Sequence, residues 1–457
     1  MHGPLKERLV LCHGCWDLLH IGHIRHLQEA RALGDRLLVS VTADEHVKKG
    51  LGRPHFNQNE RVEALKALDC VDDAFVCQFG TGAEVIEAIR PAIYCKGIDY
   101  ADQVATNPHT QAEIATLAAY GGEFHVTKAQ KYSSSRLLNA QRLSSEAVEY
   151  LASVRNRGFL SEIQDAMAKA DELVIGFVGE RIIDEYRYVR ALGKPSKEFI
   201  LATVADHTEY YNGGVEAAAA QCEWRGAKVI TAGSPLVKMR YVDADFNRKL
   251  FEVYSHTTTV QTTLVRQEFR DVLWDAVRTC DLVMVFDFGH GLLGAIERAT
   301  LNEARCLAIN VQTNAGNVGF NPVVKYAHAD MVCIDEPEAR FATRRQWEPM
   351  ADVLGDLSRH FMGAKIMVTH GRQGAVVWDD LAKEITEIPA FASQNADTIG
   401  AGDAFLSAAA PLVAVGLAPE VAAFVGNVAG ALKTQIVGHR RHVTRSELMV
   451  NVEALLS

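Results

Sequence analysis

Three features are scarce or absent in this sequence, and each absence excludes a class of protein. No apolar run is long enough to cross a membrane, because the longest, about 404–432, is interrupted by Pro411, Pro419 and Glu420. We expect two buried helices there and no membrane partner. The first residues, MHGPLKERLVLCHG, have too short an apolar run for a secretory signal peptide, so we expect a cytoplasmic protein.

An excess of positive charge is also absent. The formal net charge of -10 at pH 7 disfavours nucleic acid or an anionic membrane as the main partner. The nine cysteines are an odd number scattered through apolar segments, which predicts reduced thiols rather than a disulfide framework. Internal repeats and low-complexity tracts are lacking as well. A content of 48% hydrophobic and 23% charged residues is typical of a globular protein, and 457 residues are too many for one core.

Short apolar runs alternate with helical patterns from residue 8 to about residue 128. The predicted strands are RLVLCHG, DRLLVSVTA, DDAFVCQF, AIYCKG and GEFHVT. Such alternation predicts a parallel sheet with crossover helices, the α/β class that binds nucleotides. We therefore expect a first domain over 1–140, followed by a helical connecting segment over 141–169.

A second α/β series over 170–457 begins at ELVIGFVGE and ends at the Gly-rich helix start DTIGAGDAF. Within it, EFILATVADH and VKMRYVDADFNRKLFEVYSH alternate charged with apolar residues. Strands of this kind have one face in water, which predicts a small β lid beside the main sheet.

The stretch CHGCWDLLHIGHIRHL (12–27) is rich in potential metal ligands and thiols. A zinc site would need a second pair to match C-x-x-C, and a helix would turn the third of His20, His23 and His26 away from the first. A thioredoxin-like redox pair begins a helix within its motif, whereas this pair lies on a strand and its exit. Surface histidines beside a core cysteine remain an alternative. The favoured interpretation is a phosphate site, with His20, Gly22 and His23 at a helix N-terminus.

GCWDLLHIGH resembles the H-x-G-H signature of the cytidylyltransferase-like nucleotidyltransferases, which have a Rossmann-like fold. GRPHFNQNERVEALKALDCVD, CKGIDY and KYSSSRLL follow in the family's order, so that the resemblance covers about 130 residues. It implies that a sugar or alcohol phosphate attacks the α-phosphate of a nucleoside triphosphate and displaces pyrophosphate. The attacking phosphate is already anionic and needs no base, so the site must supply positive charge and hydrogen-bond donors, together with Mg²⁺.

The resemblance assigns His20 and His23 as the catalytic donors. Lys48, Lys49 and Arg53 are candidates for neutralising charge, although a solvated face explains each lysine equally well. His26 is expected to be structural, while His13 and Trp16 depart from the residues usual in the family. The residues expected to bind nucleotide, phosphate or acceptor are Gly14, Gly22, Lys96, Asp99, Ser133, Ser134 and Ser135.

DTIGAGDAF (397–405) contains a tight turn into a helix whose free N–H groups can bind an anion, with Asp403 placed to take a proton from a hydroxyl. Together with YYNGGVEAAAA, VTHGRQGAVVW and NVAGALKTQIVG, it resembles the ribokinase/PfkB carbohydrate kinases over roughly 170–450. The resemblance implies an ATP-dependent kinase in which Asp403 is the catalytic base. Gly400, Ala401, Gly402, Gly371 and Asn427 would bind ATP and its transferred phosphate.

On the acceptor side, the resemblance assigns the sugar to Asp184, Gly213 and Gly214 and a phosphate on that sugar to Lys238 and Arg240. It also places Asp287 at the acceptor, and Glu338 on Mg²⁺ through water. Three positions depart from the family. Asp335 stands in place of Asn, Asn310 lies where a D-P-K-like segment is expected, and the usual G-D pair after the first kinase strand reads Gly179-Glu180. These departures leave the phosphate acceptor open, and a kinase-like domain without activity is an alternative.

The pair of domains resembles bifunctional heptose kinase/nucleotidyltransferases of cell-surface polysaccharide synthesis, with the domain order reversed. We expect a cytoplasmic enzyme of nucleotide-sugar biosynthesis that uses ATP in the kinase and CTP or ATP in the nucleotidyltransferase. Its expected partners are small sugars or sugar phosphates and a second copy of the chain in a dimer. A polyol or other small alcohol as acceptor, or a ligand-sensing kinase-like domain, are the alternatives.

Overall fold

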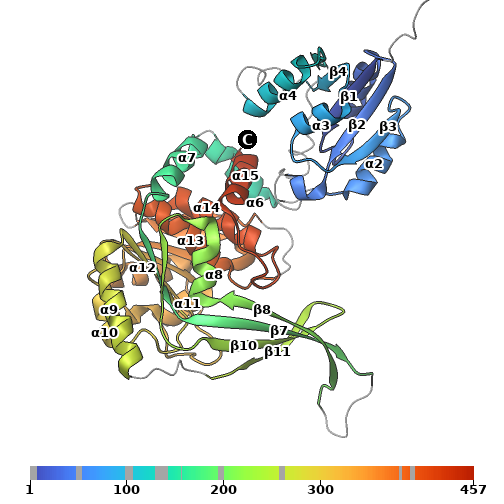
Figure 1. Ribbon diagram of the computed structural model, residues 1–457. Coiled ribbons are helices and arrows are strands. Elements are labelled where there is room, and N and C mark those ends of the chain that lie inside the picture. Colours follow the sequence, from blue (N-terminus) through green and yellow to red (C-terminus); the bar gives the residue numbers. More distant parts are fainter. Residues whose placement is uncertain are drawn as a thin grey trace, which may run out of the picture. The chain divides into compact units, whose positions relative to one another are not determined.

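Packing divides the chain into two compact units, residues 1–141 and 142–457. The computed structural model, shown in Figure 1, describes residues 8–47, 54–97, 107–128, 143–155, 157–193, 200–256, 263–379, 383–391 and 397–456.

The first unit is built on a five-stranded parallel sheet in the order β3-β2-β1-β4-β5, so the predicted Rossmann-like fold is confirmed. Strands β2 and β3 lie on one side of β1, and β4 and β5 lie on the other, so the strand order reverses at β1. In sheets of this type a ligand binds where the order reverses, at the carboxyl ends of β1 and β4. Its elements are β1 (Leu9–Gly14), α1 (Ile21–Arg31), β2 (Arg36–Thr42), a 3-10 turn (Asp44–His46), α2 (Gln58–Lys66), β3 (Asp73–Cys77), α3 (Gly82–Ile89), β4 (Ile93–Lys96), α4 (Pro108–Ala118) and β5 (Glu123–Val126).

The second unit contains an eight-stranded sheet in the order β17-β16-β15-β14-β13-β12-β6-β9, in which β16 is antiparallel to both of its neighbours, β15 and β17. Every residue of β12 is buried, as expected for a strand covered on both faces. The strands are β6 (Ile175–Gly179), β9 (Ala227–Ile230), β12 (Leu282–Asp287), β13 (Leu307–Val311), β14 (Met331–Asp335), β15 (Lys365–Thr369), β16 (Ala375–Asp379) and β17 (Glu384–Ile388).

Helices cover both faces of this sheet. One core cluster joins β12 to β15 with α9 to α12, while α8, α13 and α14 also pack on the strands. The helices are α6 (Ser145–Arg155), α7 (Phe159–Ala170), α8 (Gly214–Ala220), α9 (Thr263–Thr279), α10 (Ala295–Leu301), α11 (Glu336–Thr343), α12 (Met350–His360), α13 (Ala401–Ala414), α14 (Pro419–Lys433) and α15 (Arg445–Leu456), with 3-10 turns at Gln221–Glu223, Val323–Lys325 and Gly371–Gln373.

The lid is a separate four-stranded sheet that extends away from the main sheet (Figure 1). Its order is β11-β10-β7-β8, from β7 (Arg181–Ala191), β8 (Thr203–Gly213), β10 (Leu236–Asp243) and β11 (Arg248–Tyr254). The predicted lid segments supply β8, β10 and β11, but the central strand β7 was missed. Its sequence, RIIDEYRYVRA, places charged Asp184 and Glu185 at buried positions, which hides the alternation of a strand.

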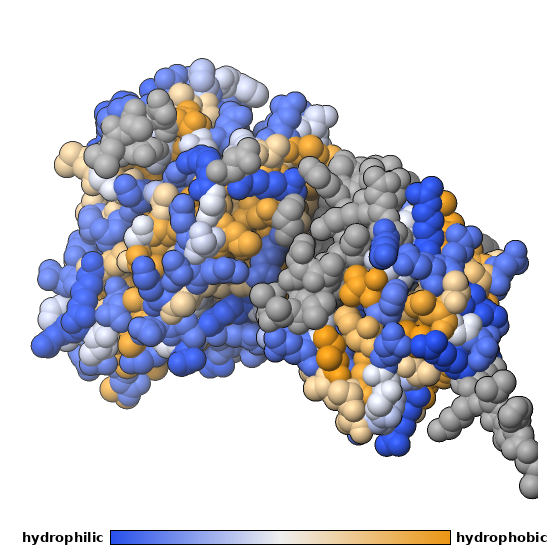
Figure 2. Space-filling view, turned by 90° about the horizontal axis from the view of Figure 1, so that it is seen from above, coloured by the Kyte–Doolittle hydropathy of each residue, from blue (hydrophilic) through white to orange (hydrophobic). Residues whose placement is uncertain are grey.

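The apolar region 404–432 forms α13 and α14, the two buried helices that the sequence predicts. Pro411 lies inside α13, however, and the helices are separated after Ala414. No helix among the described residues is long and apolar enough to span a membrane. On the face shown in Figure 2, hydrophilic residues predominate and hydrophobic ones form separate groups.

The expected connecting segment 141–169 forms α6 and most of α7, which pack within the second unit. Five residues of α7 are buried against this unit, where the helix contacts α13, α14 and α15. The Arg155 guanidinium of α6 donates to the carbonyl of Leu455 at 2.9 Å. The buried residues of α7 are Phe159, Ile163, Ala166, Met167 and Ala170.

A truncation therefore tests where the second unit begins. Fragment 142–457 should unfold cooperatively, whereas fragment 170–457 should be less stable by roughly 4–8 kcal/mol, because it exposes the site where Phe159, Ile163 and Met167 are buried. Urea unfolding followed by circular dichroism measures both. Equal midpoints for the two fragments would show that α7 is a dispensable connector.

Candidate active sites

His20 caps the helix that carries the H-I-G-H motif. Its Nδ1 accepts hydrogen bonds from the backbone N–H groups of Gly22 (3.1 Å) and His23 (3.3 Å), two of the donors that the start of α1 would otherwise leave unsatisfied. An accepting Nδ1 carries no proton, so the neutral His20 ring carries its proton on Nε2. The side chain is thus both a helix cap and a hydrogen-bond donor.

His23 has the opposite arrangement. Its Nδ1 lies 3.0 Å from the carbonyl of Leu18, which can only accept, so this nitrogen is protonated. The rings of His20 and His23 stack with centroids 3.8 Å apart, and Trp16 packs edge-on to His23. The predicted pair is therefore adjacent, but His23 can donate from Nε2 only as an imidazolium whereas His20 can do so when neutral.

A buried arginine, which the motif contains but the sequence analysis did not single out, supports this loop. The Arg61 side chain is fully buried and donates to the carbonyls of Cys15 and Thr42, at the ends of β1 and β2. It also forms an ion pair with Asp44 at 2.5 Å. Arg61 lies on α2, within the segment GRPHFNQNERVEALKALDCVD that resembles the family. Its place in this segment was the only sequence feature that pointed to a role for Arg61.

Lys96 lies at the end of β4, and its Nζ pairs with Glu113 Oε1 at 2.9 Å. Burial, followed by the charge of Lys96, lowers the pKa of His13 to about 4. Lys96 and His13 are thus close together at the carboxyl ends of β4 and β1. The sequence did not anticipate that Glu113 neutralises the lysine.

The remaining residues of the first motif are structural or lie outside the described ranges. A Cβ at Gly14 would meet the Trp16 ring at 3.1 Å, and His26 Nδ1 lies 2.6 Å from Thr127 Oγ1 in the core. Cys12 is buried beside Cys95, all nine cysteines are free, and the described residues contain no cluster of three potential metal ligands. The predicted residues outside the described part of the chain are Lys48, Lys49, Arg53, Asp99, Ser133, Ser134 and Ser135.

In the second unit, the GAGD motif opens α13 at the edge of a cavity of about 940 Å³. Gly400 is the N-cap and has a left-handed backbone (φ 76°), which favours glycine. The predicted nucleotide residues are brought together here. Those that line the cavity are Gly371, Asn427, Glu338, Gly400, Ala401, Gly402 and Asp403.

Asp403 is almost completely buried in the first turn of α13. Burial raises the pKa of its carboxyl to about 6, although nearby His439, Lys433 and Lys238 oppose the shift. The Gln312 side chain donates to Asp403 Oδ1 at 3.0 Å. A carboxylate with this pKa is ionised at neutral pH and basic enough to accept the proton of a hydroxyl group.

Asp184 of the lid is paired inside the protein. It accepts from Arg240, and His439 Nε2 lies 3.2 Å from its Oδ2. Burial alone would raise the pKa of Asp184, but these partners hold it well below its usual range. A Cβ at Gly213 would lie only 2.2 Å from Asp184 Oδ2, and Gly214 has φ 60°, so the paired glycines allow the lid carboxylate to approach.

Arg240 and Lys238 differ in their availability. The Arg240 guanidinium also bonds Glu252 at 2.7 Å, so two carboxylates balance its charge. Lys238 is buried, and its Nζ lies over the Tyr254 ring at 5.3 Å with no acidic side chain in salt-bridge contact among the described residues. Of the two predicted phosphate ligands, Lys238 is therefore better placed than Arg240 to bind an added negative charge.

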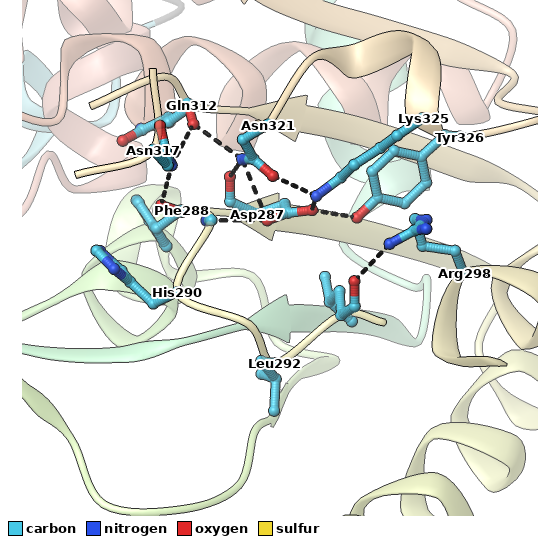
Figure 3. Close-up of polar contacts among 12 residues, drawn as sticks. Asp287, Phe288, His290, Leu292, Arg298, Gln312, Asn317, Asn321, Lys325 and Tyr326 are labelled. Atoms are coloured by element: carbon cyan, nitrogen blue, oxygen red, sulfur yellow. Dashed lines mark hydrogen bonds and ion pairs between the residues drawn. The ribbon is translucent and has the colours of Figure 1, made fainter. Parts of the chain in front are cut away.

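Asp287 lies in a separate buried cluster, shown in Figure 3. Its Oδ2 accepts from Tyr326 at 2.6 Å and pairs with Lys325 at 2.5 Å, while Oδ1 accepts from the Gly289 N–H. Next to it, burial and then the charge of Asp287 raise the pKa of Glu180 to about 7. Through these contacts Asp287 connects the loop that follows β12 to the segment that follows β13.

Both carboxylate oxygens of Glu338 accept hydrogen bonds from the backbone. Its Oε1 accepts the Thr313 N–H at 2.8 Å and its Oε2 the Asp335 N–H at 3.0 Å. Burial, followed by the charge of Asp335, raises the pKa of Glu338 to about 8. A nearby Mg²⁺ would relieve this crowding of negative charge. Asn310, which replaces the expected aspartate, donates to the Cys333 carbonyl.

Three further cavity-side residues carry charge that the motifs did not indicate. Lys249 of the lid pairs with Asp397 at 2.6 Å. The Lys433 Nζ donates to the Gly438 carbonyl at 2.5 Å, and burial lowers its pKa to about 8. His439 follows in the same loop. Lys249 and His439 lie outside the quoted kinase motifs, whereas Lys433 lies within NVAGALKTQIVG but was not singled out there.

Both halves match known families. Residues 11–140 match the sequence profile described as cytidylyltransferase-like, and residues 301–444 that of the pfkB family carbohydrate kinases. Residues 11–140 are thus similar to the first family, and residues 301–444, later in the chain, are similar to the second. The predicted resemblance and the order of the domains are thereby confirmed.

Curated relatives are similar over part of the chain. "Bifunctional protein HldE" of Methylococcus capsulatus is 40% identical over 145 residues, and that of Geotalea uraniireducens is 36% identical over 142 residues; each match covers 30% of this chain. The matches span 30% and 28% of those relatives. Phosphofructokinase-2 from Escherichia coli, solved with substrates and products, covers 62% of this chain and 99% of its own at 11% identity, with a TM-score of 0.50, which supports the fold of the pfkB-type domain.

Replacing His20 by Asn separates its two roles. Asn is a good N-cap, so the free energy of unfolding should change by less than about 1 kcal/mol. Loss of the Nε2 donor should still slow nucleotidyl transfer by about 100-fold. Thermal unfolding and pyrophosphate release measure the two effects, with His20→Ala as the variant that loses both. Full activity in His20→Asn would show that Nε2 does not act in catalysis.

The raised pKa of Asp403 predicts how phosphorylation depends on pH. Because the base must be ionised, kcat/KM should fall about tenfold per pH unit below about pH 6 and level off above it. Gln312→Leu removes an N–H that stabilises the ionised carboxylate, so its profile should shift to higher pH. ADP formation followed from about pH 5 to about pH 8 measures both. A flat wild-type profile would contradict the assignment.

Proposed function

We propose that this chain is a bifunctional enzyme of nucleotide-sugar biosynthesis. One domain phosphorylates a heptose-like sugar or sugar phosphate with ATP, and the other transfers a nucleotidyl group from CTP or ATP to a sugar 1-phosphate. The observation that carries the proposal is the occurrence, in one chain, of the His20–His23 pair at the start of α1 and of Asp403 at the cavity above α13. The partial match to "Bifunctional protein HldE" relatives supports the same pairing of activities.

In the nucleotidyltransferase, an oxygen of the sugar phosphate forms the new bond to the α-phosphorus as the bond to pyrophosphate breaks. Negative charge grows on the α-phosphoryl oxygens and on the leaving pyrophosphate. The Nε2–H of His20 and that of protonated His23 donate to these oxygens, together with the N-terminus of α1. No proton is removed from the attacking group, in agreement with the absence of a base from the donor pair.

In the kinase, Asp403 accepts the proton of the acceptor hydroxyl as its oxygen bonds to the γ-phosphorus and ADP leaves. The N–H groups at the start of α13 hold the transferred phosphoryl group. Glu338, which lines the cavity, would hold Mg²⁺ through water, and the ion would supply positive charge to the phosphates of ATP. Lys238 is the cation that we assign to a phosphate already on the acceptor.

A sugar rather than a simple alcohol fits the lid. The Asp184 carboxylate, approached closely by Gly213, provides an acceptor for sugar hydroxyls, and buried Lys238 adds a positive charge that an uncharged polyol would leave unpaired. A purely ligand-sensing domain is less well supported, because the base and the anion-binding turn of the kinase are both in place.

We also propose a homodimer formed through the outer face of the lid. That face carries exposed Phe251 and Val253 on β11 beside Met239 and Tyr241 on β10, a group of apolar side chains that a second copy would cover. The nine free cysteines fit the reducing cytoplasm.

Two substitutions should separate the activities. Asp403→Asn should lower phosphorylation by at least about 100-fold and leave pyrophosphate release within about twofold, because the sites lie in different units. His23→Ala should do the reverse. The substrates come from a matrix of sugars, heptose and hexose phosphates, polyols and the four common nucleoside triphosphates, read by mass spectrometry. Loss of both activities in either variant would contradict independent sites, and turnover of polyols alone would contradict the sugar assignment.

A further inference from the structure

We propose that His439 is a catalytic residue of the kinase site, which donates a hydrogen bond from Nδ1 to the transferred phosphoryl group. The proposal rests on the kinase activity proposed above. His439 lies in the loop after α14, where its ring contacts two parts of the site at once: the lid carboxylate of Asp184 and the Gly400 turn that opens α13.

The contact with Asp184 fixes one ring nitrogen. His439 Nε2 lies 3.2 Å from Asp184 Oδ2, and Arg240 bonds the other oxygen of the same carboxylate. These partners hold the pKa of Asp184 well below its usual range, so the carboxyl is ionised and can only accept. His439 Nε2 therefore carries a proton, and the free nitrogen of the ring is Nδ1.

Nδ1 faces the anion-binding turn. A Cβ at Gly400 would lie 3.0 Å from His439 Cε1 and 3.7 Å from Nδ1, so the ring edge with Nδ1 borders the N-cap of α13. The His439 side chain is only 8% exposed, and Nδ1 is buried without a hydrogen-bond partner among the described residues. A buried polar atom without a partner is costly, and a ligand at this turn would supply the partner.

The charges around the His439 ring favour donation of a hydrogen bond from Nδ1 when a phosphoryl group is bound. Since Nε2 is already protonated, donation from Nδ1 requires the imidazolium, whose charge the ionised Asp184 balances. A phosphoryl group at the α13 N-terminus adds negative charge on the Nδ1 side. The charged groups that face this region are Asp184 on β7, Lys238 and Arg240 on β10, Lys249 on β11, Asp397 before α13, Asp403 on α13 and Lys433 on α14.

This arrangement links the two substrates. Asp184, which we assign to the sugar, and the phosphoryl group from ATP would contact opposite nitrogens of one ring. Binding of the acceptor to Asp184 would therefore orient the donor that stabilises the transferred group. His439 thus acts in the step itself, in addition to holding the lid carboxylate.

Two isosteric substitutions distinguish the nitrogens. The amide nitrogen of Asn can occupy the position of Nδ1, and that of Gln the position of Nε2. His439→Gln should keep the acceptor KM and lower kcat by about 100-fold, as for loss of one oxyanion donor. His439→Asn should retain kcat within about tenfold but raise the acceptor KM, because Asp184 loses its partner.

The kinetics use the full-length protein, ATP, Mg²⁺ and the acceptor with the highest kcat/KM in the substrate matrix. Thermal unfolding of each variant followed by circular dichroism, with a midpoint near that of the wild type, is the control for folding of the unit that contains His439. Equal kcat in the two variants, or higher kcat in His439→Gln, would overturn the proposal.

A second measurement does not require an acceptor. Titration calorimetry compares binding of ADP with Mg²⁺ in the presence and absence of fluoroaluminate, which mimics the transferred phosphoryl group. Fluoroaluminate should tighten binding to the wild type and His439→Asn but not to His439→Gln. Equal tightening in all three proteins would overturn the role of His439. Absence of ADP formation with every acceptor would instead refute the proposed kinase, so the two failures can be told apart.

Discussion

The second unit depends on the burial of one negative charge, the Asp403 carboxylate at the start of α13. A carboxylate removed from water is unstable unless positive charge surrounds it. The protein meets this need with the N-terminus of the helix and with side chains from three other elements that lower the pKa of Asp403: Lys238 of the lid, Lys433 at the end of α14 and His439 in the following loop. The elements that stabilise the Asp403 carboxylate are therefore also the ones that surround the proposed phosphate site.

In both units the candidate phosphate site lies at a helix N-terminus, but the two N-termini differ in their free hydrogen-bond donors. In α1 the side chain of His20 occupies two backbone donors, so the imidazoles themselves replace part of the positive end of the helix. In α13 the N-cap is Gly400, which has no side chain, and the backbone N–H groups stay accessible to a ligand. The first solution suits a site that must stabilise charge on two sides of a phosphorus. The second suits a tight pocket for one terminal phosphate.

Patterns with a regular period were sufficient to predict most of the fold. The parallel sheets followed from apolar runs such as LVLC and LVMVFD, and the phosphate-binding turns from glycines at helix starts. The strand β7 was not predictable in the same way, because Asp184 and Glu185 occupy buried positions whose partners come from elsewhere in the chain. The same reason applies to Arg61, Glu113 and His439. Each is a polar residue whose role depends on a contact distant in sequence, and only the folded structure brings the partners together.

A single residue, Glu180, separates β6 from β7 and therefore joins the main sheet to the lid. Its buried carboxylate accepts hydrogen bonds from the backbone N–H groups of Phe288 and His290, in the loop after β12. The connection between β6 and β7 is thus short and fixed by hydrogen bonds. Glu180 is held to the loop after β12 by these hydrogen bonds. A rotation of the lid about Glu180 would therefore also displace that loop.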